Sequence, residues 1–184
     1  MRLFIAITPP EAVLDELEGR LAPLRPAWPG LRWASRETWH ITLAFLGEVS
    51  ETTVAALEPR LRRAAQRYPG QALSLAGAGA FPRRARAQVL WAGIRANQGS
   101  LSKLAASVAA GARRAGAPPP DEGRRFSPHL TLARSKVPAD VRLLVAALDD
   151  FAGTEWTASH IHLIHSRLHD RPRYLTTASW PLRS

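Results

Sequence analysis

The chain has 184 residues and no cysteine. A protein without cysteine has no disulfide framework, and it has no thiolate that could bind a metal ion or act as a nucleophile. This composition fits a cytoplasmic protein, and we expect that location.

The sequence also has no long apolar run. A membrane-spanning helix needs roughly 18 consecutive apolar residues, and no stretch of the chain approaches that length. The first ten residues hold a short apolar run that ends at Pro9 and Pro10, which favours a strand over a secretory signal. We therefore expect a soluble protein with no membrane partner.

Lysine is scarce as well. Of 25 basic residues only Lys103 and Lys136 are lysines, so arginine carries almost all of the net charge of +10. The planar guanidinium binds phosphate through two hydrogen bonds and stacks on bases, so an arginine-rich surface fits a polyanionic partner such as RNA. A genome that favours arginine codons would give the same composition, so the charge alone leaves the partner open.

The most informative feature that is present is a four-residue motif that occurs twice. His40-Ile-Thr42-Leu and His129-Leu-Thr131-Leu begin 89 residues apart, from 40 to 129, in a chain of 184. This spacing is close to half the chain and indicates two related halves. In a strand, residues i and i+2 lie on the same face, so each motif presents an imidazole beside a hydroxyl. Two such strands facing one another would bring both pairs to one cleft.

This set of side chains suits phosphoester chemistry. One imidazole can accept a proton, the other can donate one, and the hydroxyls can hold phosphate oxygens. A single His-x-Thr is more often a hydrogen-bonded histidine in a half-buried strand. The second copy near the midpoint of the chain favours the functional interpretation.

Hydrophobic periodicity and turn residues predict strands and helices that alternate along the chain. Strands are expected at 2–8, 31–33, 39–46, 71–80, 87–94, 126–134, 154–165 and 172–180, and helices at 11–24, 50–68, 101–114 and 138–148. Because strands also occur in adjacent pairs, we expect an α+β fold with antiparallel sheets rather than one parallel sheet.

With these motifs the chain resembles the two-histidine phosphoesterases, and within them the RNA 2′,3′-cyclic phosphodiesterases historically called 2′-5′ RNA ligases. The resemblance covers nearly the whole chain. Its specific parts are the two His-x-Thr segments, and its weaker parts are Arg32-Trp33, Ser166-Arg-Leu168, Pro172-x-Tyr174 and Trp180-Pro-Leu182. It implies a single bilobal domain over residues 1–184, in which two pseudo-symmetric antiparallel sheets backed by helices enclose a central cleft.

The resemblance also implies an activity, the hydrolysis of RNA 2′,3′-cyclic phosphate ends to 2′-phosphomonoesters. It assigns His40 as proton donor to the leaving 3′ oxygen and His129 as proton acceptor from water, a distinction that residue types alone do not make. Thr42 and Thr131 would hydrogen-bond the non-bridging phosphate oxygens. The reverse reaction would be 2′-5′ RNA ligation without ATP, and the chain has no P-loop sequence for ATP.

Several further residues are candidates for substrate contact. Arg134 follows His129 by five positions and would face away from it on a regular strand, so a phosphate role requires the strand to end and the chain to turn there. Arg124 and Arg125 are candidates for the RNA backbone, with a solvated surface position as the alternative for all three arginines. Phe45 or Trp33 could stack on a base, with a place in the core as the alternative.

His160, His162 and His165 are close in sequence and raise the question of a metal site. On a strand, His160 and His162 share a face while His165 points away, and no cysteine or paired carboxylate completes a tetrahedral site. We expect strand-surface histidines, no metal and no cofactor.

Two alternative functions remain open at this point. One is a phosphodiesterase for small cyclic nucleotides or related cyclic phosphates, and the other is a non-catalytic RNA-binding module. The family usually has glycine where this chain has Arg171, and an apolar residue is common where it has Thr177, so the substrate preference is open. We expect a monomer in each case.

Overall fold

The computed structural model describes residues 1–121 and 123–184. The strands and helices are β1 (Arg2–Ile7), α1 (Glu11–Leu21), β2 (Arg32–Trp33), β3 (Ile41–Glu48), α2 (Glu51–Gln66), β4 (Gln71–Arg83), β5 (Arg86–Ala96), α3 (Gln98–Ala115), β6 (His129–Ala139), α4 (Arg142–Leu148), β7 (Trp156–Ala158), β8 (His160–Ser166) and β9 (Tyr174–Pro181). The predicted α+β class is confirmed.

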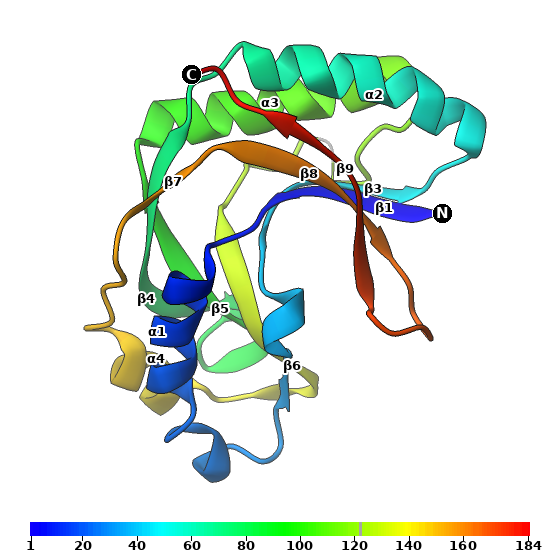
Figure 1. The fold of residues 1–184 in the computed structure, drawn as a ribbon. Coiled ribbons are helices and arrows are strands. Elements are labelled where there is room, and N and C mark those ends of the chain that lie inside the picture. Colours follow the sequence, from blue (N-terminus) through cyan, green and yellow to red (C-terminus); the bar gives the residue numbers. More distant parts are fainter. Residues whose placement is uncertain (122) are drawn as a thin grey trace.

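The strands form one curled antiparallel sheet, shown in Figure 1. Its order is β7-β4-β5-β6-β3-β1-β8-β9, and the short strand β2 pairs with β6 outside this path. One half of the sheet comprises β1, β3, β8 and β9, and the other half comprises β4, β5, β6 and β7. Between β3 and β6 the register contains a single residue pair, Ile41 with Leu130, so the two halves meet at one point.

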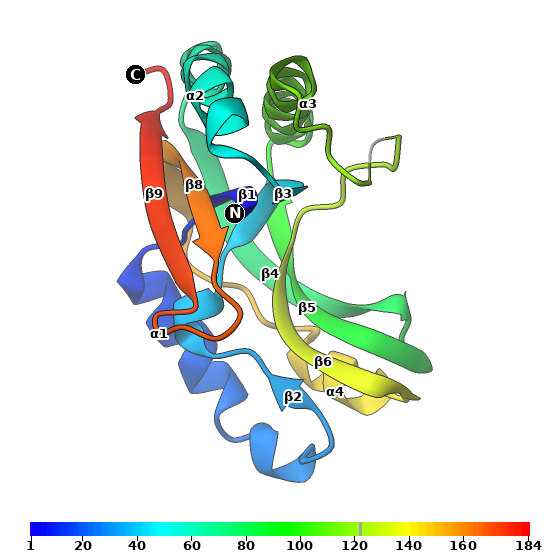
Figure 2. The same cartoon turned by 90° about the vertical axis from the view of Figure 1, so that its right-hand side faces the viewer.

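Each half of the sheet has its own layer of helices, and a large hydrophobic core lies under each layer. Helices α2 and α3 pack side by side against the half that contains β1 and β8, while α1 and α4 cover the half that contains β5 and β6 (Figures 1 and 2). The periodicity of α1 explains its packing, because Val13, Leu14, Leu17 and Leu21 recur on one helical face and are buried. The helices therefore take one face of the sheet, which leaves the other face for a site.

Several predicted boundaries were wrong, and three of them have a clear consequence for the fold. The region 154–165 forms two strands rather than one, because β7 pairs with β4 in one half of the sheet while β8 pairs with β1 in the other. The fourth helix begins at Arg142 and not near Pro138, because β6 continues to Ala139 and the Asp140 carboxylate accepts a hydrogen bond from the backbone N–H of Arg142. Helix α1 ends at Leu21, three residues earlier than expected. In the described part of the chain, no helix has the length and apolar character needed to cross a bilayer.

Candidate active site

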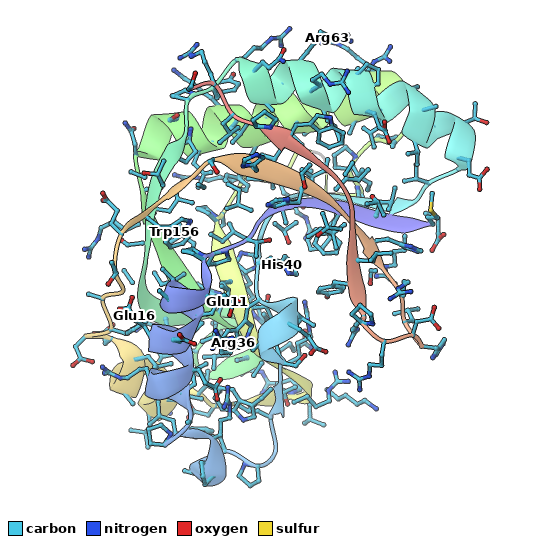
Figure 3. All side chains as sticks on the ribbon, viewed as in Figure 1. Glu11, Glu16, Arg36, His40, Arg63 and Trp156 are labelled. Carbon is cyan, nitrogen blue, oxygen red and sulfur yellow. The ribbon has the colours of Figure 1, made fainter. Side chains whose placement is uncertain are left out.

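The pair Ile41 and Leu130, where the halves of the sheet meet, sets the arrangement of both motifs. The two strands are antiparallel, so His40 lies opposite Thr131, and Thr42 lies opposite His129. Both apolar side chains are fully buried. Because side chains alternate along a strand, the histidine of each motif lies beside the threonine of the other motif. These four side chains project from the face of the sheet opposite to that of Ile41 and Leu130. Figure 3 shows His40 near the centre of the molecule, under the arch of β1 and β8.

Each motif ends in a bulge at its fourth residue. On β3, Ile5 pairs with Ala44 and Ala6 with Thr42, so Leu43 has no partner on β1. On β6, Leu90 pairs with Ala133 and Trp91 with Thr131, which leaves Leu132 in the equivalent place. A bulge inserts one residue and therefore reverses the alternation of all side chains beyond it.

The bulges bring two further side chains to the face that carries the motifs. Leu43 and Ala44 are both buried and Phe45 is 46% exposed, while Leu132 and Ala133 are both buried and Arg134 is exposed. We expected that Arg134 could face the site only if the strand ended there, and this was wrong. Strand β6 continues to Ala139, and the bulge turns Arg134 toward His129. The alternative for Phe45, a buried position in the core, is also wrong, since its side chain is exposed.

The histidine rings are anchored in the same way in both halves. The Nδ1 of His129 lies 2.8 Å from the backbone oxygen of Ser127, two residues earlier. His40 likewise hydrogen-bonds to the backbone of Thr38, two residues before it. A proton on Nδ1 of His129 satisfies the Ser127 carbonyl, and this tautomer leaves Nε2 as an acceptor in the cleft.

Burial determines the charge of both rings. It lowers the pKa of His40 to about 4; the hydrogen bond to Thr38 opposes this effect, and the nearby His129 adds to it. The pKa of His129 is also lowered, first by burial and further by the positive charge of Arg134, while the hydrogen bond to Ser127 raises it. Both imidazoles are therefore predominantly neutral at pH 7 in the free protein.

Aromatic side chains hold the His40 ring. Phe4 stacks on it with 4.6 Å between ring centroids, and Tyr174 meets it edge to face at 5.1 Å. In the sequence, Tyr174 was only part of a flanking segment, and no pattern pointed to Phe4. Phe4 comes from β1 and Tyr174 from β9, so only the sheet order reveals their place in the site.

A second aromatic group holds the His129 ring. Phe81 meets it edge to face with 5.0 Å between centroids, and Trp91 lies 6.3 Å away. Trp91 lies over Gly79, its cross-strand partner, where a Cβ atom would be 2.3 Å from the indole. Neither aromatic residue was identified from the sequence, although the glycine opposite Trp91 was an available signal.

A cavity of about 840 Å³ opens beside this site. Among the described residues its lining includes His129, Thr42 and Phe45 but not His40, Thr131 or Arg134. Further lining comes from the β4–β5 hairpin, from α3 and from the segment before β6: Phe81, Pro82, Gln88, Val89, Ser102, Ala105, Ala106, Ala109, Arg113, Pro119, Asp121, Arg124, Arg125, Phe126 and Ser127. The cavity thus extends from one side of the histidine pair only. Trp33, by contrast, is half buried and packs against the hydrophobic core under α1 and α4.

The three histidines of β8 lie apart from this cavity. His160 and His162 stack at 6.3 Å, and their Nδ1 atoms lie 2.8 Å from Ser159 Oγ and 2.7 Å from Ser179 Oγ. Among the residues that the structure describes, no group of three or more histidine, aspartate or glutamate side chains is arranged to bind a metal ion.

The chain is similar to a defined family of proteins. A family profile described as the 2′-5′ RNA ligase superfamily matches residues 10–170. The chain is 38% identical to the RNA 2′,3′-cyclic phosphodiesterase of Aeropyrum pernix over 141 residues, which is 74% of this chain and 78% of that protein. It is 35% identical to the protein of the same name from Escherichia coli over 72% of this chain and 71% of that one.

Solved structures agree with these sequence similarities. The crystal structure of TT0787 of Thermus thermophilus superimposes with a TM-score of 0.79 at 29% identity, covering 100% of this chain and 99% of that one. The crystal structure of E. coli LigT complexed with 3′-AMP gives a TM-score of 0.79 at 30% identity, covering 100% of this chain and 98% of that one.

Proposed function

The chain belongs to the 2′-5′ RNA ligase superfamily, and on that premise we propose that it hydrolyses RNA 2′,3′-cyclic phosphate ends to 2′-phosphomonoesters. The observation that supports this function best is the junction of Ile41 with Leu130. It brings the two histidines and the two threonines of the motifs together on one face of the sheet. Residues 1–184 act as one bilobal unit in this proposal, because each half supplies one histidine.

The roles follow from the reaction and from the resemblance. Water attacks phosphorus, His129 takes a proton from that water through Nε2, and the bond from phosphorus to the 3′ oxygen breaks while His40 gives that oxygen a proton. Thr42 and Thr131 donate to the non-bridging oxygens. Arg134, turned to the same face by its bulge, stabilises the charge that develops on them.

The ionisation of the two rings supports this assignment of roles. His129 is neutral in the free protein, as a general base must be, because burial and Arg134 both lower its pKa. His40 has a pKa of about 4 and must gain a proton before it can act as an acid. A bound phosphate monoanion beside the ring favours the imidazolium, so substrate binding supplies the condition for protonation.

The proposal has consequences for substrate, direction and location. Microscopic reversibility allows the same groups to join a cyclic phosphate end to a 5′-hydroxyl, which would be 2′-5′ ligation without ATP. RNA ends as substrates fit the arginine-rich composition and a cytoplasmic location. A monomer suffices, since one chain contains both motifs.

The test is an incubation of the protein in EDTA with a short RNA that ends in a 2′,3′-cyclic phosphate. Chromatography that separates 2′- from 3′-phosphate products reports the direction of ring opening. We expect a 2′-phosphate that forms despite chelation and is lost in His40→Ala and His129→Ala. Formation of a 3′-phosphate would reverse the assigned leaving group.

Two other outcomes would favour the alternatives. Turnover of small cyclic nucleotides without turnover of RNA would favour a small-molecule phosphodiesterase, whose selectivity would depend on the loop at Arg171; this residue contacts Glu37, just before the first motif, at 3.5 Å. RNA binding that persists without any turnover would favour the binding module.

A further inference from the structure

Arg32 of β2 lies directly opposite Arg134 of β6. The register of the two antiparallel strands pairs Arg32 with Arg134 and Trp33 with Ala133, and Figure 2 shows β2 beside β6. Side chains of directly opposite residues project from the same face of an antiparallel pair, with about 4.5–5.5 Å between the Cα atoms. The two guanidinium groups therefore leave the sheet side by side.

Two neighbouring residues identify the face from which this arginine pair projects. Trp33, the next residue of β2, packs against the hydrophobic core under α1 and α4, so Arg32 points to the other face. At the other edge of β6, Arg134 pairs with Val89, which lines the cavity beside His129. Arg32 and Arg134 thus both lie on the face that carries the two motifs, and both are exposed.

The charge of the arginine pair is not neutralised within the described part of the protein. Like charges that lie directly opposite each other in a sheet repel and destabilise it. Among the residues that the structure describes, no carboxylate forms an ion pair with either guanidinium. Arg36, four positions after Arg32, pairs by contrast with both Glu11 and Asp15. An anionic ligand would offset the repulsion, and the guanidinium fork matches the oxygens of a phosphate.

The proposed function uses only one of these two cations. Arg134 stabilises the charge on the cyclic phosphate, which lies between the two motifs, and Arg32 is one strand further out on the same face. In an RNA strand the nucleoside that carries the cyclic end holds a second phosphate on its 5′ oxygen. A nucleoside 2′,3′-cyclic phosphate with a free 5′-hydroxyl has no such group.

We propose that Arg32 binds the phosphate on the 5′ oxygen of the nucleoside that carries the cyclic end. The inference rests on the proposed function and adds a selectivity to it, a preference for cyclic ends with a 5′-phosphate. The phosphate is either the next phosphodiester of an RNA strand or a terminal phosphomonoester. Arg32 is a binding residue and takes no part in proton transfer, which remains with His40 and His129.

Three substrates that differ only at the 5′ oxygen test this role. Adenosine 2′,3′-cyclic phosphate has a 5′-hydroxyl, its 5′-phosphorylated form has a phosphomonoester, and ApA with a 2′,3′-cyclic phosphate end has a phosphodiester. We would measure kcat/KM for each substrate with intact protein, Arg32→Gln and Arg32→Lys. The matched control is Arg62→Gln, which removes an exposed arginine from α2 on the other face of the sheet.

We expect Arg32→Gln to lower kcat/KM by roughly tenfold for the two substrates with a 5′-phosphate and to leave adenosine 2′,3′-cyclic phosphate unchanged. Arg32→Lys keeps the charge without the fork, so it should recover only part of the loss. Arg62→Gln should match intact protein on all three substrates. Loss with the phosphomonoester alone would support the site and identify a nucleotide 5′-phosphate, and not an RNA strand, as its ligand.

Two results would overturn the proposal. One is an equal loss with all three substrates, because Arg32 would then act on the cyclic end or on the fold in general. The other is unchanged kinetics of Arg32→Gln with both phosphorylated substrates. The melting temperature of Arg32→Gln should not fall, since the variant removes the repulsion with Arg134. Intact protein that turns over none of the three substrates, nor a longer cyclic-phosphate RNA, would instead remove the proposed function itself.

The dependence on salt provides a second measurement of the same contact. A plot of log kcat/KM against log salt concentration for the dinucleotide should be less steep in Arg32→Gln than in intact protein. The slopes should differ by roughly 0.7, the value for one phosphate contact to a single strand. An unchanged slope would contradict a phosphate contact of Arg32, even if the rate had fallen.

Discussion

Ile41 of β3 pairs with Leu130 of β6, and this single pair joins the two halves of the sheet. The two residues hold the same position in the two motifs, so the contact lies on the axis that relates the halves. Each points a fully buried side chain into its core, and the neighbouring histidines and threonines therefore project from the other face. This pair therefore fixes which residues of the two motifs lie opposite each other.

The two threonines provide the first prediction. Thr42→Val and Thr131→Val preserve shape and β-propensity but remove the hydroxyl that, in the proposed function, donates to a phosphate oxygen. A hydrogen bond to a charged group is worth about 1.5–3 kcal/mol, so kcat/KM for a cyclic-phosphate RNA should fall about 10- to 150-fold in each variant. Steady-state kinetics measures this, with Thr176→Val, an exposed threonine of β9, as the control.

Both threonines contact the same phosphate in this scheme, so their effects should not add fully. A double variant whose loss equals the product of the two single losses would show that the hydroxyls act independently. Unchanged kinetics in either single variant would exclude a phosphate contact for that residue.

Arg134 provides the second prediction. Arg134→Gln removes a positive charge from the face of His129, so phosphate binding should weaken and kcat/KM should fall by about 10- to 100-fold. Because Arg134 helps to lower the pKa of His129, its removal should raise that pKa. The ascending limb of the pH profile of kcat/KM, where His129 loses its proton, should move to higher pH.

The matched control is Arg63→Gln, since Figure 3 shows Arg63 on the outer side of α2, away from His40. This variant should keep both the rate and the pH profile. If Arg134→Gln behaves like Arg63→Gln, the bulge at Leu132 does not serve the site.

The sequence indicated which side chains the candidate site contains, but not how they are arranged. The repeated motif and its spacing identified both histidines and both threonines, and the resemblance predicted the fold. The face of Arg134 could not be predicted, because the bulge at Leu132 arises from the register of β6 against β5, and register depends on residues far away in the chain. The face of Phe45 could not be predicted for the same reason, because the bulge at Leu43 arises from the register of β3 against β1.

The surroundings of the histidines were not predictable either. Phe4 and Tyr174 reach His40 from strands that lie 170 residues apart, from 4 to 174, and only the sheet order brings them together. The wall of the cavity comes from α3, whose sequence is that of an ordinary alanine-rich helix. Local patterns carry no information on such long-range contacts.

The pKa of His40 leads to a prediction about stability. A histidine has an unperturbed pKa near 6.5, and burial lowers that of His40 to about 4 in the folded state. Below pH 6.5 the unfolded chain therefore binds a proton that the folded chain does not. This stabilisation is present above pH 6.5 and is lost progressively as the pH falls to about 4.

When the pH falls from 7 to 5, this single group should lower the free energy of unfolding by about 2 kcal/mol. Urea denaturation at the two pH values measures the loss, and His40→Gln, which cannot be protonated, should lose about that much less than the intact protein. His129 and His162 also have lowered pKa values and remain in both proteins, so their contributions cancel in the comparison. Identical pH dependence of the two proteins would mean that the His40 ring is not held neutral by burial.

The contact of Gly79 with Trp91 provides the last prediction. An alanine at position 79 would place its Cβ 2.3 Å from the indole, so the ring or the strand must shift. Overpacking of this kind costs about 1–3 kcal/mol, and displacement of Trp91 from its place beside His129 should also lower kcat/KM by about tenfold. Denaturation and kinetics of Gly79→Ala measure the two effects.

Two companion variants separate this contact from a general effect of removing glycine. In Gly79→Ala combined with Trp91→Leu the smaller side chain removes the clash, so the double variant should be more stable than the sum of the single losses. Gly19→Ala on the exposed face of α1, where a Cβ meets no atom within 4 Å, should instead stabilise the protein by about 0.5–1 kcal/mol. Additive losses in the double variant would show that Gly79 is not required by the Trp91 ring, and the aromatic support of His129 would then need another explanation.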